Sequence, residues 1–572
     1  MTIWRSAITI PPLATLDERI RGLFSPGAMY RCYPEPMGTL AERRMRQMSS
    51  DIRSKSDWME MIHDADTRTG WAVEAKAKEL TDVEFAYVLD ELVYYASLHP
   101  PGSNIRLSAA DGVWFSDALI DADATNELRD YAAILENVPD RQKDWYPKDR
   151  SRVLNLIDPS LFPLIYSRSK LFRQTSTSPQ AALKLEDVGE FPGSPEGWHN
   201  AINFAEDGES KYYIPLPAGD NQYGYYSSDK FSWLPSEFRI GDNGAVTIES
   251  YINNLHPVKH AALYPIIASV FSKFLPLLEQ VLTDLVHPRQ LRVKSDPDKY
   301  YRSDELLPDS DDDDYYEEVR RWKRRATFVH PQPKPFVIPD RPVNPYKLCG
   351  RWLQAIVKMT NVELTAKRPI YGGEDWSVAG LDNECIIATG IFFYDVANIA
   401  PSSLRFREAL CGWNFAADQW DIESVVKAYG IERVQLDNGD HASQELGSMV
   451  IKDRRCLVFP NIHQYKMPEL KLADKTNPGH CKMLTYYFVD PSTRIPSTEI
   501  VPPQQQDWCF EDILASEPFR SLPQLVVDGI LAKVDFPISF KEAKKARLQV
   551  HQDKTSRGVI TDLFEPSLFF SG

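Results

Sequence analysis

An apolar run at positions 386–394 constrains the fold of this chain more than any other segment. It reads IIATGIFFY and follows a polar turn, EDWSVAGLDNEC. A run of mostly apolar residues entered from a loop predicts a buried strand. Because β-barrels commonly bind ligands at the mouths of their strands, this turn and strand are the first place to look for a functional site. The candidate pocket residues here are Trp376, Ser377, Ala379, Glu384 and Phe393.

Short β-prone runs continue through the second half of the chain, separated by Gly, Pro and Asn. They are Leu353–Met359, Ile386–Tyr394, Gly447–Val450, Arg455–Phe459 and Lys482–Val489. Short strands with turn signals between them favour an antiparallel sandwich or jelly roll over alternating βα units. We therefore predict a β-rich core at residues 346–510.

Helical patterns dominate the first half of the chain. Residues 1–90 predict a helical N-terminal unit, with helices expected at Leu40–Met61 and Trp71–Tyr94. Helices are also expected to continue into RVLNLIDPSLFPLIYSRSKLF, residues 152–172. The chain has 572 residues, whereas single cores stop growing at roughly 250–300 residues, so we expect two or more packed units.

Residues 91–345 predict helices and loops that pack on the core, and residues 511–572 predict a C-terminal extension. Segment His256–Leu285 is apolar on nearly every side, which indicates a buried scaffold helix that Pro265 and Pro276 kink or divide. Aromatic residues on the loops before it form either a packed surface or a wall over a hydrophobic ligand. They are Tyr212, Tyr213, Tyr223, Tyr225, Tyr226, Phe231 and Trp233.

The charge balance argues against nucleic-acid binding. The net charge is -16 and the pI is about 5.3, so the average surface repels phosphate groups. A dense basic cluster at 320–325 follows the acidic run Asp309–Asp314. We expect these two blocks to neutralise each other on a solvated loop and helix.

Cysteine usage and hydropathy indicate a soluble protein in a reducing compartment. The seven cysteines are scattered and never spaced CxxC, which predicts neither a disulfide framework nor a zinc site. The apolar patch near the N-terminus is broken by Pro11 and Pro12, and no run approaches the roughly 18 apolar residues of a membrane span. We expect a cytoplasmic protein without a membrane partner, and the oligomeric state stays open.

Eight segments between residues 152 and 508 carry a resemblance to a known family. They are RVLNLIDPSLFPLIYSRSK, WLPSEFRI, VTIESYINNLHPVKHAALYPII, LQAIVKMTNVELT, NECIIATGIFFYD, LVFPNIHQYKM, ADKTNPGHCKMLTYYFVDPSTRIPST and VPPQQQDW. In this order they resemble a family of uncharacterised fungal and bacterial proteins that is similar to iron(II)/2-oxoglutarate-dependent oxygenases. The resemblance implies an α+β fold class with a double-stranded β-helix core, which is a cupin-like jelly roll, and extensive flanking helices.

The resemblance breaks at the residues that would carry oxygenase chemistry. In the family motifs Trp-His-x-Glu-Gly, Phe-Pro-Asn-x-x-Gln-His-Arg and Gly-His-Arg-Lys, two His and the Glu would hold iron(II), and the Arg of the third motif would bind 2-oxoglutarate. The matching positions in this chain are Ser377, Ala379, Tyr465 and Cys481. Serine and neutral tyrosine are poor ligands, alanine offers no donor atom, and cysteine cannot make the bidentate contact of arginine. We therefore expect no metal and no other cofactor.

A shifted set of ligands is an alternative. His463 lies two residues before Tyr465 and would face the same side of an extended segment. His480 is close in sequence, although the family already has a histidine there, which favours a structural role. Two histidines without a carboxylate are an incomplete triad, and Asp382 or Glu384 would have to complete it.

One further sequence match is better explained as surface. His551-Gln552-Asp553 spells the HxD of a facial triad, but it lies beyond the β-rich region, and no later histidine completes the set. We predict a surface turn at this position.

Replacing charged ligands by Ser, Ala, Tyr and Cys leaves a roomier and less polar pocket, which suits a large apolar guest. We favour a cofactor-independent enzyme of fungal specialised metabolism that cyclises or isomerises a hydrophobic terpenoid or polyketide. A pericyclic (4+2) cycloaddition, as in a Diels-Alderase, is the sharpest version. The proposed hydrogen-bond donors are Tyr465, His463, Ser377 and Lys482.

Two other classes of function compete with this hypothesis. The chain could be a pseudoenzyme that binds a ligand or a protein partner, or an oxygenase or hydrolase that uses an unrecognised site. The enzyme hypothesis needs no metal, because holding a reactive conformer can supply about 7–11 kcal/mol of a barrier. A hydrogen bond to a carbonyl that gains charge in the transition state adds a few kcal/mol.

Overall fold

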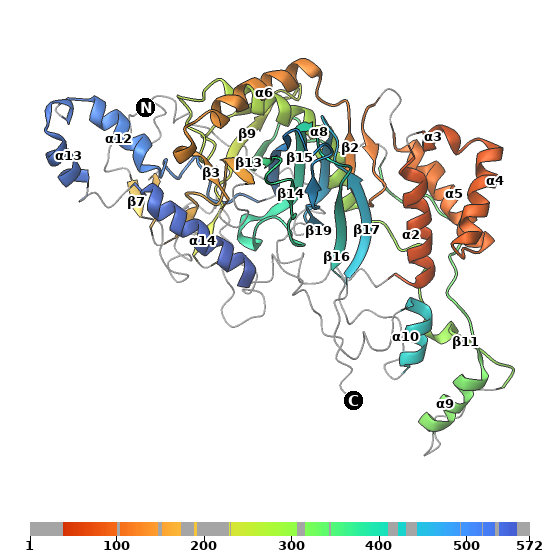
Figure 1. Ribbon diagram of the computed structural model, residues 1–572. Helices are drawn as coiled ribbons and strands as arrows, with labels where there is room; N and C mark the ends of the chain where they lie inside the picture. Colours follow the sequence, from red (N-terminus) through yellow and green to blue (C-terminus); the bar gives the residue numbers. More distant parts are fainter. Residues whose placement is uncertain are drawn as a thin grey trace.

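The computed structural model describes residues 38–556, apart from 56, 100–102, 147–151, 167, 173–187, 191–227, 229, 306–314, 343–344, 410–420, 431–442, 492, 518, 532 and 534–536. A large antiparallel sheet lies at the centre, with the N-terminal helices on one flank and the C-terminal helices on the other (Figure 1). This combination of an antiparallel sheet with separate helices is an α+β architecture. The predicted aromatic residues Tyr212, Tyr213, Tyr223, Tyr225 and Tyr226 lie outside the described residues.

Ten strands form the large sheet. Its main path runs β1 (Arg106–Leu107), β2 (Trp114–Ser116), β18 (Cys456–Pro460), β15 (Ile386–Ala397), β21 (Gly479–Val489), β13 (Trp352–Leu364), β4 (Val153–Ile157) and β3 (Asp144–Trp145), while β9 (Ser236–Ile240) pairs with β13 and β10 (Val246–Ile248) pairs with β9. The neighbours in this sheet are antiparallel. The long strands β13, β15 and β21 therefore form its centre.

A small sheet covers one face of the large one. It contains β17 (Ser443–Val450), β16 (Ser403–Ala409) and β19 (His463–Lys466), in that order. Leu404 and Phe406 from β16 pack in one buried cluster with Ile391 and Phe393 from β15. All five strands expected from the sequence are confirmed, and pairing with neighbouring strands extends most of them by a few residues.

The opposite face of the large sheet packs on α8 (Leu263–Val286). Rings of Phe271 and Phe274 on this helix meet Tyr486 and Phe488 on β21, with centroids 5.2–5.5 Å apart. The predicted scaffold helix is thus confirmed, although it begins at Leu263 and continues undivided through Pro276. In the described part of the chain, α8 alone is long and apolar enough to cross a membrane, and 78% of its most apolar window is buried as core.

Within the described residues, four helices precede the sheet: α2 (Leu40–Arg53), α3 (Trp58–Met61), α4 (Ala65–Ala77) and α5 (Asp82–Ser97). The sequence predicted helices here, but each predicted helix is in fact two. Thr81 and Glu84 form a capping box at the start of α5, and Glu79 adopts a left-handed φ of 63°. These features end one helix and start the next, because a capping box satisfies backbone groups that a continuous helix would pair internally.

The expectation of helices at 152–172 is wrong. The segment forms β4, β5 (Leu164–Ile165) and β6 (Lys170–Phe172) instead. Val153 and Leu154 pair with β13 at Val362 and Asn361. Pairing with β13 stabilises the segment as a strand. Such tertiary pairing outweighs the local preference of the segment for a helix.

The remaining elements surround the two sheets. They are α6 (Ala122–Glu136), α9 (Tyr315–Arg325), α10 (Ile422–Tyr429), α12 (Gln506–Ala515), α13 (Gln524–Leu531), α14 (Phe540–Ser556), the 3-10 turns Asp140–Gln142, Pro297–Lys299, Asp382–Glu384 and Phe519–Ser521, and the strands β7 (Val188–Glu190), β8 (Phe231–Ser232), β11 (Tyr301–Arg302), β12 (Thr327–Phe328), β14 (Ile370–Tyr371) and β20 (Leu470–Lys471). Helix α14 packs on β8, because its residues Ala546 and Val550 share a buried cluster with Phe231.

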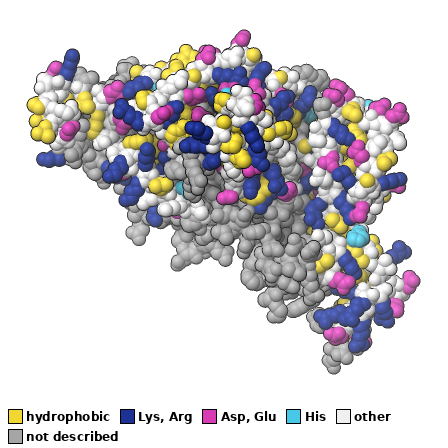
Figure 2. Space-filling view, viewed as in Figure 1, with side chains coloured by type: hydrophobic (Ala, Val, Ile, Leu, Met, Phe, Trp, Pro, Cys, Tyr) yellow, Lys and Arg dark blue, Asp and Glu magenta, His cyan; other side chains and the backbone are white. Residues whose placement is uncertain are grey.

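The basic cluster predicted at 320–325 lies on α9, which projects from the molecule with Lys and Arg side chains on its surface (Figure 2). Lys323 pairs with Asp421 at 2.9 Å, and Arg325 pairs with Glu305 at 3.0 Å. The acidic run Asp309–Asp314 lies outside the described residues, so its pairing with this cluster stays a prediction.

The contact between β15 and α8 can be tested at Gly390. A Cβ atom there would lie 2.9 Å from ring atoms of both Phe274 and Phe488. Gly390→Ala should therefore lower the free energy of unfolding by about 1–3 kcal/mol, the usual cost of overpacking a core. Urea denaturation of the purified protein measures this change.

Gly70→Ala is the matched control, because Gly70 lies inside α4 with no atom within 4 Å of a new Cβ. Alanine in a helix interior is favoured over glycine by about 0.5–1 kcal/mol, so this variant should gain stability. Equal effects at the two positions would contradict close packing at Gly390.

Candidate functional site

The side chains that face the space between the two sheets are apolar at one end and partly polar at the other. Apolar side chains fill one part of it: Val362, Ile391, Phe393, Leu404, Phe406, Leu457 and Cys481. Every second residue of a strand faces the same side, so further along these strands other residues face this space. Among them, Lys358 pairs with Thr485, and Thr389 pairs with Tyr487. One end of the inter-sheet space is therefore apolar, and the end near the start of β15 carries polar groups. A mostly apolar interior with a few convergent polar groups is how small-molecule sites are built.

Backbone pairing brings three of the four family-motif positions together. Ser377 donates to the carbonyl of Tyr465 at 3.1 Å, and Tyr465 donates back to that of Ser377 at 2.9 Å. Buried Asn461 holds Ala379 through both of its amide atoms, at 2.8 and 2.9 Å. The same side chain donates to the carbonyl of Ile386 at 3.1 Å. The turn before β15 is thus fixed against β19.

Tyr465 reaches inward from β19 and forms a pair with Tyr487. Its ring meets Phe459 with centroids 5.1 Å apart, and the two phenol groups are hydrogen-bonding partners. Burial, reinforced by Tyr487 and the carboxylate of Glu374, raises the pKa of Tyr465 well above its ordinary value. Burial likewise raises the pKa of Tyr487. Both hydroxyls stay protonated at neutral pH, so one donates to the other and the second keeps a proton that it can donate to a further partner.

Lys358 adds a positive charge beside this pair. Burial lowers the pKa of its ammonium, but Glu374, Tyr465 and Asp158 outweigh that effect and leave the pKa above its ordinary value. Lys358 therefore stays charged next to the two phenols. A fixed cation with two hydroxyl donors is an arrangement that stabilises negative charge developing on a carbonyl oxygen.

Glu384 and Trp233 close the polar end of the inter-sheet space. The Glu384 carboxylate accepts hydrogen bonds from the backbone N–H groups of Trp233, at 3.0 Å, and Leu381. Trp233 packs with Ala379 and Tyr487 in one buried cluster, and its ring centroid lies 5.3 Å from that of Tyr487. The predicted pocket residues Ala379 and Glu384 are therefore placed beside the predicted donor Tyr465.

Helix α14 covers this end and contributes Lys554. Val550 and Ala546 on the helix pack with Phe231, while Arg547 pairs with Asp144 and Asp158. Nζ of Lys554 lies 3.1 Å from the centroid of the Trp233 ring. Lys554 is thus a fourth functional group at the site.

The surface turn predicted at 551–553 is wrong, because these residues lie within α14. The ring of His551 meets that of Tyr146 edge to face, with centroids 6.2 Å apart, and Asp553 accepts a hydrogen bond from Ser228. Both residues hold the helix in place. The missing iron-site histidine is therefore not hidden in this segment.

Trp376 lies away from the inter-sheet space. Its ring is covered by Arg407 at 4.5 Å and Arg405 at 5.5 Å. These arginines alternate along β16 with the inward-facing Leu404 and Phe406, so they lie on the outer face of the small sheet. The expectation that Trp376 shapes the pocket is corrected by this alternation.

Lys482 and Cys481 also lie apart from the polar end. Lys482 pairs with Glu136 at 3.0 Å and with Asp395 at 3.4 Å. These partners lie at the ends of α6 and β15, so the ammonium faces away from the two phenols. Cys481 faces inward but is fully buried in the apolar cluster with Phe393, six residues from Tyr487 on β21, or about 20 Å of strand. Burial raises the pKa of the Cys481 thiol to about 12.

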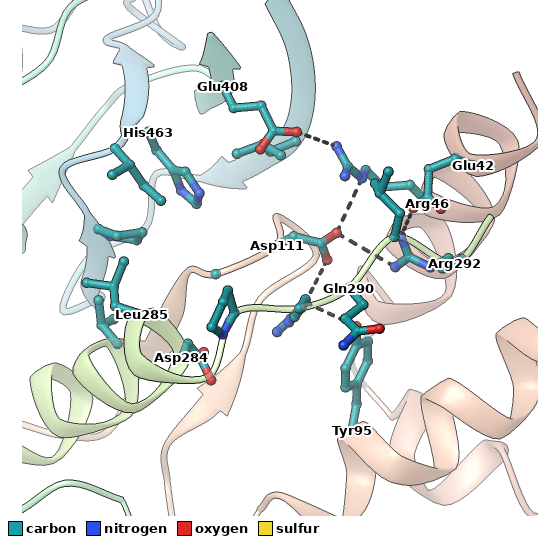
Figure 3. Close-up of a pocket in the computed structure, with 18 of the residues that line it drawn as sticks. Glu42, Arg46, Tyr95, Asp111, Asp284, Leu285, Gln290, Arg292, Glu408 and His463 are labelled. Carbon is teal, nitrogen blue, oxygen red and sulfur yellow. Dashed lines mark hydrogen bonds and ion pairs between the residues drawn. The ribbon is translucent and has the colours of Figure 1, made fainter. Parts of the chain in front are cut away.

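His463 lies in a different cavity, which Figure 3 shows. This cavity of about 120 Å³ separates α2, α5 and the segment after α8 from the sheet edge. The imidazole ring of His463 packs against Gly112. A Cβ atom on Gly112 would lie only 2.8 Å from Cε1 of His463. His463 does share a strand face with Tyr465, as predicted, but the two side chains reach separate surroundings.

Buried ion pairs line the rest of the His463 cavity. Arg46 pairs with Glu408 at 3.1 Å and with Asp111 at 3.5 Å, and Arg292 pairs with Glu42 at 2.7 Å (Figure 3). Burial lowers the pKa of His463 to about 3, although Asp111 opposes the shift. The histidine is therefore neutral, and the network joins the N-terminal helices to the small sheet.

The residues present do not fit iron(II) or 2-oxoglutarate. Ser377 and Tyr465 adjoin as two triad ligands would, but a hydroxyl and a protonated phenol are weak donors for iron(II). Ala379 offers a methyl group, and Cys481 lies in apolar core. The described residues also contain no group of three or more His, Cys, Asp or Glu arranged to hold a metal. We derive no step through either group.

The fold and this site define an α+β protein with a hydroxyl- and amine-lined interior between two sheets. Residues 82–512 match the family model described as "Protein of unknown function (DUF4246)", and the chain belongs to this family. No curated protein matches the chain. Among solved structures it is similar to a selenomethionine-labelled Fe(II)/(alpha)ketoglutarate-dependent dioxygenase, TqaL, at 8% identity over 46% of this chain and 71% of that chain. The TM-score of 0.20 is too low to support an argument about fold.

Three groups at the site were missed from the sequence. Tyr487 and Lys358 lie inside apolar strand runs, and a lone lysine in such a run is a usable signal for an interior polar position. Lys554 carries no comparable signal, because it ends a charged helix whose contact with Trp233 is purely tertiary.

Lys554 makes a testable contribution to stability. Burial lowers its pKa to about 8, against the opposing field of Glu384 and with a smaller contribution from Lys358. The unfolded chain keeps this proton until about pH 10.4, so the charge costs about 3 kcal/mol below pH 8 and the cost disappears as pH rises to 10.4. Lys554→Met should therefore stabilise the protein at pH 7 and much less at pH 10, as urea denaturation would show.

Lys482→Met is the matched control, because this lysine is ion-paired with Glu136 and Asp395. It should lose stability at both pH values. A Lys554→Met variant less stable than wild type at pH 7 would contradict the cost assigned to its charge.

His463 predicts a similar loss of stability at low pH, but in a more acidic range. The folded protein holds it neutral down to about pH 3, whereas the unfolded chain binds a proton near pH 6.5. Stability is complete above pH 6.5 and falls as the pH drops, by about 3 kcal/mol at pH 4.5 from this residue. His463→Gln should shrink the difference in unfolding free energy between pH 7 and 4.5, which urea denaturation at the two pH values measures.

Proposed function

We propose that this protein is an enzyme of fungal specialised metabolism that cyclises or isomerises a hydrophobic terpenoid or polyketide carbonyl compound, without oxidation and without a metal or co-substrate. We further infer that the two packed sheets are a double-stranded β-helix core and that the enzyme works in the cytoplasm. The observation that carries the proposal is the pair of protonated phenols, Tyr465 and Tyr487, beside the charged Lys358. Tyr465 stands where the family resemblance would place an iron ligand.

The chemistry follows from these groups. One phenol of the pair donates a hydrogen bond to the substrate carbonyl while it accepts one from the other phenol, and Lys358 stabilises the negative charge that grows on the carbonyl oxygen. Polarising the carbonyl activates a conjugated diene or enone for ring closure or for double-bond migration. Each such donor contributes about 3–4 kcal/mol in comparable sites. The side chains of Trp233, Ala379 and Ile356 form an apolar wall against which a reactive conformer can be held.

The class of reaction can be tested by mass. Cyclisation or isomerisation leaves the mass of the substrate unchanged, whereas oxygenation adds oxygen. Purified protein should convert members of a set of linear polyenyl ketones and aldehydes into isomers of equal mass, under nitrogen and with a chelator present. An oxidised product that requires iron and 2-oxoglutarate would overturn the proposal, and binding without turnover would favour the pseudoenzyme.

Tyr465→Phe removes the proposed donor while keeping the ring. Turnover should fall about ten- to a thousand-fold, because one hydrogen bond to a developing oxyanion is lost. The matched control is Tyr486→Phe, whose hydroxyl faces α8 and donates to the carbonyl of Ile267 at 2.8 Å. It should cost about 1 kcal/mol of stability and leave turnover unchanged. Equal turnover in both variants would remove Tyr465 from the mechanism.

A further inference from the structure

Lys554 is a buried amine that has no hydrogen-bond partner among the described residues. Its side chain is 5% exposed, and within the described part of the chain Nζ neither donates a hydrogen bond nor forms an ion pair. Lysines this deeply buried are ordinarily paired, because an isolated ammonium is costly to remove from water. A structural lysine would therefore be expected to form the salt bridge that this one lacks.

The Trp233 ring connects the Lys554 amine to the candidate site. Nζ lies 3.1 Å from the centroid of the Trp233 ring, and the same ring contacts Tyr487, the partner of Tyr465. Glu384, which anchors the backbone of Trp233 at 3.0 Å, is the carboxylate that acts most strongly on the amine. The amine, the indole and the two phenols thus occupy one end of the inter-sheet space.

We propose that Lys554 is a catalytic nucleophile that forms an imine with an aldehyde or ketone substrate in the inter-sheet space. This inference rests on the proposed function and narrows its substrate to a compound with a free carbonyl carbon. A residue that bonds to substrate should be buried and free of a partner that holds it, and Lys554 is buried with no hydrogen-bond partner among the described residues. The Trp233 ring that it contacts also contacts Tyr487.

The step balances without an added reagent. The neutral amine attacks the carbonyl carbon, a C–N bond forms, and the C–O π electrons move to oxygen, which gains a proton. If the proton that the oxygen gained comes from nitrogen, a second proton from the site lets the oxygen leave as water, and the remaining C=N bond is that of a protonated imine. Tyr465 and Tyr487 can protonate the departing hydroxyl. Addition of water reverses the sequence and releases the product.

The surroundings favour the neutral amine. Burial lowers the pKa of Lys554 to about 8, and Lys358 adds to this, while Glu384, Asp158 and Asp553 oppose it. At pH 7.5 about a quarter of such amines are neutral, about two-hundred-fold more than for an exposed lysine. A protonated imine conjugated to a polyene is a stronger electron sink than the carbonyl, so it would accelerate cyclisation or isomerisation beyond what hydrogen bonding provides.

Reductive trapping tests the inference. The full-length protein is incubated with benzaldehyde and sodium cyanoborohydride at pH 7.5, digested, and mapped by mass spectrometry. N-benzylation of Lys554 should proceed at least about ten-fold faster than at Lys482 or at exposed lysines, because its neutral fraction is larger. Labelling of Lys554 no faster than that of exposed lysines would overturn the proposal.

A second measurement, an NMR titration, uses the wild-type protein and so does not require a variant to fold. Reductive methylation with ¹³C-formaldehyde makes each lysine visible by NMR, and the Lys554 signal should titrate near pH 8. A midpoint of ten or more would overturn the proposal. In Lys554→Arg the fast-labelled peptide should disappear while the labelling of other lysines stays the same, which assigns the signal.

The two proposals fail in distinguishable ways. Fast labelling of Lys554 in a protein that converts no polyenyl carbonyl compound would sustain the amine and overturn the proposed isomerase. Isomerisation that continues at the wild-type rate in Lys554→Arg would sustain the proposed function and overturn the imine. Tyr465→Phe should slow imine formation without changing the titration midpoint by a full unit, since its phenol is neutral throughout that range.

Discussion

Strand β15 buries side chains on both of its faces, and the layers of the molecule follow from this constraint. Ala388 and Phe392 pack toward α8, while Ile391 and Phe393 pack toward the small sheet. Gly390 lets the rings of α8 approach the strand closely. A strand that is apolar on both faces must be covered twice, by a helix layer and by a second sheet. The helices at the two ends of the chain then enclose the flanks of this sandwich (Figure 1).

Because both faces are covered, several polar side chains are buried between the sheets. The hydrogen bonds and charges around each of these side chains determine its protonation state. Tyr465 and Tyr487 satisfy each other, and carboxylates balance the charge of Lys358. Lys554 is balanced by no hydrogen bond among the described residues. Because a buried unpaired amine costs free energy, this group has the strongest claim to a role in chemistry rather than in folding.

A second buried electrostatic environment joins the N-terminal helices to the small sheet. There Arg46 links α2 to Glu408 on β16, and Arg292 links α2 to α5 through Glu42 and Glu91. Each arginine has carboxylate partners, and the neighbouring His463 stays neutral. Matched charges of this kind hold elements together, whereas the Lys554 amine at the other site has no hydrogen-bond partner among the described residues.

The sequence by itself determined the central strands and the scaffold helix, because continuous burial leaves apolar runs that local pattern can reveal. It also determined that Ser, Ala and Tyr stand at the positions where the resemblance would place iron ligands, since ligand chemistry is a property of residue type. Only the tertiary structure decided which candidates share a site. Trp376, His463 and Lys482 lie elsewhere, and Lys554 enters from the C-terminal helix. Side-chain direction depends on strand register and on which elements cover each face, and both are set by residues distant in the chain.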